Sequence, residues 1–126
     1  MMKFLYKALV VITLSAATMV SNAQERIKGP VFDFVETARV DVDMHVPKDE
    51  VLKVVFDTYK GADSGKVNST FLSAARFINM HVDAGHPKEN IKVAIVVHGS
   101  TSIDVSQNSY YGSKHDGAMN DNIPVI

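Results

Sequence analysis

Two segments of the chain are almost continuously apolar and rich in β-branched residues, the pattern expected of a strand that is covered on both faces. The first runs from Val51 to Asp57 and the second from Ile91 to His98. Between them, apolar residues recur at the three- and four-residue spacing of one helix face: Phe71, Ala74, Ala75, Ile78 and Val82. The pattern predicts a βαβ unit, in which the two strands are parallel and the crossover is right-handed.

Both ends of the predicted helix carry their own signals. Asn68 precedes the apolar stripe, and its side-chain oxygen can accept a hydrogen bond from a backbone N–H of the first turn. Gly85 supplies the left-handed residue that follows many helices, and Pro87 prevents the helix from resuming. Three polar residues fall away from the apolar stripe: Arg76, Asn79 and Asp83.

The N-terminus has the pattern of a secretory signal in residues 1–23. Lys3 and Lys7 precede an apolar run that extends from Ala8 to Val20 and ends in Ser21-Asn22-Ala23. A transmembrane helix needs roughly 20 apolar residues, and this run is shorter. We expect cleavage after Ala23, which indicates a bacterial periplasmic or secreted protein with no membrane segment after cleavage. An uncleaved N-terminal anchor is the alternative.

The remaining parts of the chain have weaker patterns. Residues 24–50 are typical of a surface segment that precedes the predicted domain, residues 51–126. Alternating apolar residues leave an edge strand open within that segment: Val40, Val42, Met44 and Val46. The polar residues after Gly99 predict a loop, with one short helical turn near Asp104.

The last five residues are Asn122-Ile123-Pro124-Val125-Ile126, the pattern of a helix cap, a first-turn proline and the first apolar residues of a helix. Two core strands also need neighbours for their backbone groups. The domain is therefore expected to be incomplete. Two interpretations follow, a truncated sequence or a partner chain that supplies the missing strands, and the apolar terminus favours truncation.

Composition excludes several classes of function. The chain has 13 Lys and Arg against 14 Asp and Glu, and no basic cluster of the kind that nucleic-acid binding requires. It contains no cysteine. Without sulfur nucleophiles and ligands, a thiolate enzyme, a persulfide carrier, an iron–sulfur cluster and a cysteine zinc site are excluded for this chain.

Several short runs occur in a fixed order: Lys53-Val54-Val55-Phe56-Asp57, Lys66-Val67-Asn68, Ala75-Arg76-Phe77-Ile78-Asn79-Met80-His81, Ala84-Gly85-His86-Pro87 and Val96-Val97-His98-Gly99. At these spacings the set resembles the DsrE/DsrF-like family, particularly its exported members. The resemblance implies a three-layer α/β domain with a mainly parallel sheet, often assembled into trimers or hexamers. It also implies sulfur relay through a cysteine persulfide, but no residue here matches the family cysteine, which follows a third core strand. The fold is therefore expected and the sulfurtransferase activity is not.

Candidate site residues follow the two predicted strands. In open α/β sheets, ligands bind at the carboxyl ends of the strands, and five polar residues are predicted to bind a ligand at this rim: Asp57, Lys60, Asn68, His98 and Ser100. A carboxylate beside an imidazole could orient it for acid–base chemistry, or the two could hold a divalent metal. The alternative is that both side chains only cap strand ends and loops.

Other candidates have simpler structural interpretations. His81 and His86 are five residues apart, which is not the spacing of a helical zinc pair, so we interpret both as structural. Ser100 lacks the G-x-S-x-G context of a hydrolase nucleophile, and no glycine loop has the lysine of a phosphate-binding P-loop. Tyr110 and Tyr111 are expected to pack rather than to stack on a ligand.

The sequence thus favours an exported, non-catalytic DsrE/DsrF-like domain that acts in assembly or in binding a small ligand, with no cofactor. The alternative is a small-molecule enzyme or metal-binding protein that uses Asp57 and His98. A third possibility is a pure interaction module, because unpaired sheet edges favour self-association. The expected partners are further copies of the chain or related DsrE-like subunits, without nucleic acid.

Overall fold

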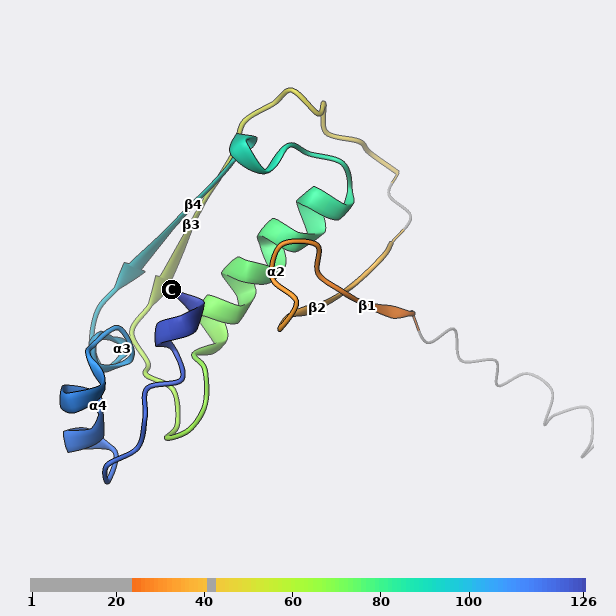
Figure 1. Cartoon of the computed structure of the whole chain (residues 1–126). Helices are drawn as coiled ribbons and strands as arrows, with labels where there is room; N and C mark the ends of the chain where they lie inside the picture. The colour runs from red at the N-terminus through yellow and green to blue at the C-terminus, as the bar shows by residue number, and fades with distance from the viewer. Residues whose placement is uncertain (1–23, 41–42) are drawn as a thin grey trace, which may run out of the picture.

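A computed structural model describes residues 24–40 and 43–126 and gives an α/β fold (Figure 1). The predicted signal sequence and Val42 lie outside these residues. The elements follow in the order β1 (Arg26–Lys28), β2 (Glu36–Ala38), β3 (Leu52–Thr58), α2 (Ser69–Asp83), the 3-10 turn η2 (Lys88–Asn90), β4 (Ile91–Val97), α3 (Thr101–Asp104), α4 (Asn108–Lys114) and the 3-10 turn η3 (Ile123–Val125). No helix in the described ranges is long and apolar enough to cross a membrane.

The strands β3 and β4 form a two-stranded parallel sheet, which confirms the predicted arrangement of strand, helix and strand. Their register runs from Leu52 opposite Ile91 to Thr58 opposite Val97. The predicted boundaries differ from the observed ones by one residue at the ends of the strands. Both strands point the same way, so their carboxyl ends lie at one edge of the molecule.

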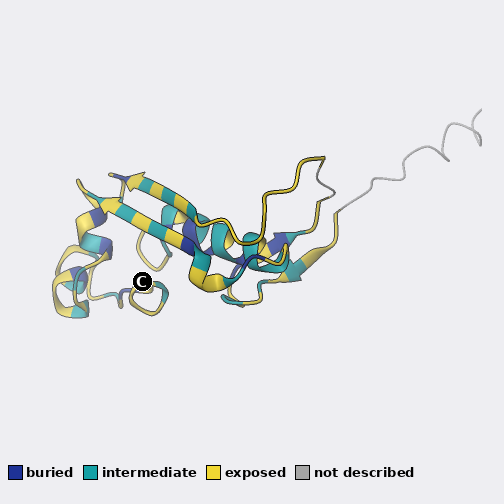
Figure 2. Cartoon of the chain, turned by 90° about the horizontal axis from the view of Figure 1, so that it is seen from above, coloured by how far each residue is buried: buried dark blue, intermediate teal, exposed yellow. Residues whose placement is uncertain are grey.

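The prediction that both faces of these strands are covered is wrong. One face packs on α2, where the rings of Phe56 and Phe77 meet edge to face at 6.3 Å. On the other face, which we call the outer face, Val55 is 66% exposed and Val96 is 51% exposed. Figure 2 shows the resulting alternation of colours along both strands. A continuous apolar run indicates that both faces of a strand would be buried by packing, but among the residues that the structure describes only α2 packs on the strands, and only on one face.

The helix α2 begins and ends where its signals indicate. Asn68 has an extended backbone, and its Oδ1 accepts a hydrogen bond from the backbone N–H of Thr70 at 2.9 Å. Gly85 has a φ of 93°, which confirms its role as the left-handed residue past the helix. Within the helix, Phe71, Ala74 and Ala75 of the predicted stripe are buried.

The side chain of Asn79 is fully buried, although the pattern separated it from the apolar stripe. Its Oδ1 accepts hydrogen bonds from the backbone N–H groups of Val31 and Phe32, and its Nδ2 donates to the carbonyls of Phe32 and Val35. These bonds take the place of hydrogen bonds to water, both for the buried Asn79 amide and for the backbone groups of residues 31–35. Asn79 therefore fastens the N-terminal segment to α2.

The N-terminal segment forms the antiparallel pair β1–β2. As predicted, most of it is exposed, but Val35 and Thr37 are buried, and β2 contacts α2. The alternation between Val40 and Val46 does not form a strand in its described part. Figure 1 accordingly shows α2 between the β3–β4 sheet and the β1–β2 pair.

The chain after β4 is more ordered than its composition predicts. The short turn near Asp104 is present as α3, whereas α4 was not predicted. Tyr111 of α4 is fully buried and stacks on His115 at 4.2 Å, so it packs as expected. Near the end of the chain, Asn122 precedes the 3-10 turn η3 rather than an α-helix, and its side chain makes no capping bond. Its side chain turns inward and accepts a hydrogen bond from the backbone N–H of Asn68.

Candidate functional site

A pocket of about 360 Å³ lies at the carboxyl end of β3. It is lined by residues 57–63, which form the end of the strand and the loop after it, and by residues 66–70, which lead into α2. This is the rim that the parallel strand arrangement predicts for a ligand. Of the five predicted site residues, Asp57, Lys60 and Asn68 line the pocket.

Asp57 and His98 lie side by side at the ends of β3 and β4. The Nε2 of His98 is 3.0 Å from Oδ1 and 3.2 Å from Oδ2 of Asp57. The Asp57 side chain is 66% exposed and that of His98 is 53% exposed. The contact engages Nε2 of the imidazole, and both side chains are exposed, so the pair has the components of an acid–base dyad at the protein surface.

Ser100 holds the loop after β3, which lines the pocket. Its Oγ accepts a hydrogen bond from the backbone N–H of Gly61 at 2.8 Å and donates to the carbonyl of Tyr59 at 3.2 Å. Its own backbone N–H donates to the same carbonyl at 3.0 Å. Ser100 is therefore close to the rim, but its hydroxyl is engaged with the backbone and it does not line the pocket.

Asn68 lines the pocket and holds the loop beside it. Its Oδ1 caps α2, and its Nδ2 donates to the carbonyl of Lys60 at 3.0 Å and to Oδ2 of Asp104 at 2.8 Å. Both amide hydrogens are thus used within the protein. A ligand in the pocket would meet the loop that Asn68 positions rather than a free donor of Asn68.

Asn68 belongs to a buried polar network that the sequence pattern does not reveal. Asp104 is fully buried, and its Oδ2 also accepts a hydrogen bond from the backbone N–H of Ala62 at 2.9 Å. Asn120 donates to the carbonyl of Asp104, and Asn122 donates to Oδ1 of Asn120. The only signal for this network was the frequency of asparagine after residue 107, in a segment without periodicity.

The charged groups of the pocket are mixed. Lys60 is exposed, and Lys66 forms an exposed ion pair with Asp63 at 3.4 Å. The first turn of α2 contains no acidic residue. The partial positive charge of a helix N-terminus adds to the two lysines, so the side of the pocket nearest α2 is suited to an anionic group.

The described ranges contain no cluster of three or more His, Asp or Glu side chains that could hold a metal ion. His81 and His86 have ring centroids 5.8 Å apart. The Nδ1 of His81 lies 2.8 Å from the carbonyl of Phe77. His86 is buried, and its burial, followed by the charges of Lys48 and His81, lowers the pKa of its imidazole below the usual value, against a smaller raising effect of Glu50.

Comparison with protein-family models, curated proteins and solved structures finds no match. The resemblance to the DsrE/DsrF-like family therefore stays an expectation from the sequence runs quoted above.

Proposed function

We propose that the chain is an exported DsrE/DsrF-like domain that binds a small anionic molecule in the pocket at the end of β3, without sulfurtransferase activity of its own. The observation that carries the proposal is the pocket at the carboxyl end of a parallel strand pair, in front of the N-terminus of α2. A persulfide relay needs a thiol, and the chain has none.

The pocket chemistry supports an anionic ligand. Lys60 and Lys66 both line the pocket, and both are exposed. A molecule with a carboxylate or phosphate could displace Asp63 from Lys66, because an exposed ion pair contributes at most about 1 kcal/mol. Asp57, which also lines the pocket, can accept a hydrogen bond from a hydroxyl or amine of the same molecule.

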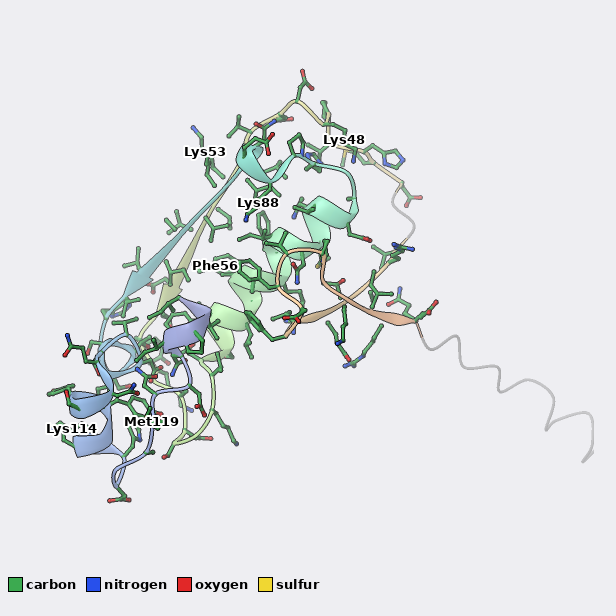
Figure 3. The ribbon with its side chains drawn as sticks, viewed as in Figure 1. Lys48, Lys53, Phe56, Lys88, Lys114 and Met119 are labelled. Carbon is green, nitrogen blue, oxygen red and sulfur yellow. The ribbon has the colours of Figure 1, made fainter. Side chains whose placement is uncertain are left out.

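The test uses inorganic phosphate as the probe and thermal unfolding as the readout. We expect phosphate to raise the melting temperature of the wild-type protein more than chloride does at equal ionic strength. The increase should disappear in the Lys60→Gln, Lys66→Gln double variant and persist in Lys88→Gln. Lys88 is an exposed lysine of η2, before the start of β4 (Figure 3), and is the matched control. Equal effects in all three proteins would refute the proposed site.

A second function has support from one specific observation, the 3.0 Å contact between His98 and Asp57. This dyad could transfer protons in a reaction of a small molecule bound at the rim. The test is hydrolysis of an activated acetate ester by the wild-type protein, His98→Gln and Ser102→Ala. A rate that falls only in His98→Gln supports the enzyme. An unchanged rate in all three proteins, equal to that of buffer, removes it.

A further inference from the structure

The strand β3 has one unpaired edge among the strands that the structure describes. It pairs with β4 on one side, and the backbone N–H of His98 donates to the carbonyl of Thr58 across that ladder. In a parallel pair, the N–H and C=O of one residue point to the same neighbour, and those of the next residue point the other way. Lys53, Val55 and Asp57 therefore direct their backbone groups to the open edge.

The side chains of these three residues lie on the outer face. Val55 is 66% exposed, and Lys53 and Asp57 are exposed as well. Figure 3 shows Lys53 pointing away from α2 and Phe56 pointing toward it. An open edge with a β-branched centre is a site for pairing with another strand, unless a protein protects it.

The sequence of β3 is complementary to itself when it is read in opposite directions. An antiparallel pair centred on Val55 sets Val55 opposite Val55, Lys53 opposite Asp57, and Val54 opposite Phe56. The charged pair occurs twice because of the two-fold symmetry. In this register, the three residues whose backbone groups point to the open edge all form hydrogen-bonded pairs across the new ladder. Hydrogen-bonded pairs recur at every second position of an antiparallel ladder, as these three residues do.

We propose that β3 pairs antiparallel with β3 of a second copy of the chain, which joins the two sheets into one of four strands in the order β4, β3, β3, β4. Two ion pairs between Lys53 and Asp57 and a central contact of the two Val55 side chains fix the register. Lys53 does not line the ligand pocket, whereas Asp57 lines it and contacts His98, so loss of the dimer in a Lys53 variant tests the strand pairing separately from the pocket.

The electrostatics within one copy favour this partner. Lys53 lies directly opposite Lys92 in the parallel register, and like charges at opposite positions destabilise a sheet. Neither lysine takes part in an ion pair within the described parts of the chain. Asp57 of the second copy would lie on the other side of Lys53 and offset this repulsion. If β3 of the second copy instead paired in parallel and in the same register, Lys53 of one copy would lie opposite Lys53 of the other.

Charge reversal tests the register. Sedimentation of the protein expressed from the full sequence should show a reversible dimer. Lys53→Glu sets two carboxylates opposite each other, and Asp57→Lys sets two lysines opposite each other, so each should weaken dimerisation by roughly tenfold or more. The double variant Lys53→Glu, Asp57→Lys restores two attractive pairs and should recover the dimer. Lys88→Glu, in the exposed turn η2 and outside the paired strands, is the control for a general charge effect and should not weaken it.

A cysteine scan gives an independent test because the chain has no cysteine of its own. In a hydrogen-bonded antiparallel pair the Cα atoms are about 5.5 Å apart, which is within disulfide range. Val55→Cys should therefore form a covalent dimer on mild oxidation. Val96→Cys is also solvent-accessible but lies on β4, and three strand spacings of about 4.8 Å separate the two copies there. A monomer at about 100 µM, far above the dissociation constant of a stable dimer, or equal cross-linking at both positions, overturns the proposal.

Discussion

Removal of the Asp104 carboxylate should destabilise the protein far more than a surface substitution. This side chain is fully buried, and its Oδ2 accepts hydrogen bonds from Ala62 at 2.9 Å and from Asn68 at 2.8 Å. In Asp104→Ala both donors lose their acceptor. A buried unsatisfied polar group costs about 1–3 kcal/mol. We expect a loss of about 3 kcal/mol in the free energy of unfolding, since Asn68 keeps its second donor bond to Lys60.

Urea unfolding followed by circular dichroism measures this loss. The control is Asp63→Ala, whose carboxylate is 80% exposed in an ion pair with Lys66, and which should change stability by less than about 0.5 kcal/mol. The two variants remove the same chemical group, one from a buried network and one from the surface of the loop. If Asp104→Ala loses no more than Asp63→Ala, the buried network does not hold the pocket loop, and the structural role assigned to Asn68 is wrong.

Three further predictions concern single positions. Gly99 has a φ of 58°, and an added Cβ would lie 2.5 Å from the carbonyl oxygen of Tyr59. Gly99→Ala should therefore lower the free energy of unfolding in urea by about 2 kcal/mol or more. The control is Gly65→Ala, which should cost about 1 kcal/mol because nothing lies within 4 Å of its added Cβ. Asn79→Ala should lose about 2 kcal/mol and speed tryptic cleavage before β3, because four hydrogen bonds to residues 31–35 are removed; unchanged cleavage would contradict it. The pKa of buried His86 is lowered in the folded protein, so the unfolded state binds a proton at this imidazole more tightly. The stability that His86 contributes is therefore present above its usual pKa of 6.5 and is lost as the pH falls below that value. His86→Gln should flatten the pH–stability curve, measured by urea unfolding, in that range.

The sequence was sufficient for the central unit because each of its elements carries a local signal. Asn68 and Gly85 delimit α2 through backbone chemistry that does not depend on distant residues. The two strands were found from their β-branched runs, and their parallel pairing followed from the crossover helix between them. The rim then followed from topology, which is why Asp57 and His98 were expected near each other.

The missed features depend on contacts between distant residues. Asn79 is polar and was separated from the apolar stripe, yet the backbone of the N-terminal segment gives it four partners. The network of Asp104, Asn120 and Asn122 joins residues far apart in the chain, and asparagine alone has no periodicity to reveal it. Buried polar groups are specified by their partners, so a pattern of single residues does not find them.

The error about the outer face has a different cause, and it bears on assembly. The alternation of apolar and polar residues that marks a half-exposed strand is absent at Val55, Ala94 and Val96, yet all three are exposed. Selection of apolar residues at exposed positions is explained if another surface covers them. The pairing of β3 with a second copy extends the sheet but does not cover its outer face. In the dimer, the exposed outer face therefore spans four strands instead of two. We therefore expect that Val96→Gln, a neutral polar change that leaves the β3 edge and its charges intact, preserves the dimer but removes any assembly larger than the dimer. If sedimentation shows only dimers in both proteins, the outer face is not an interface between copies, and the edge of β3 accounts for all self-association.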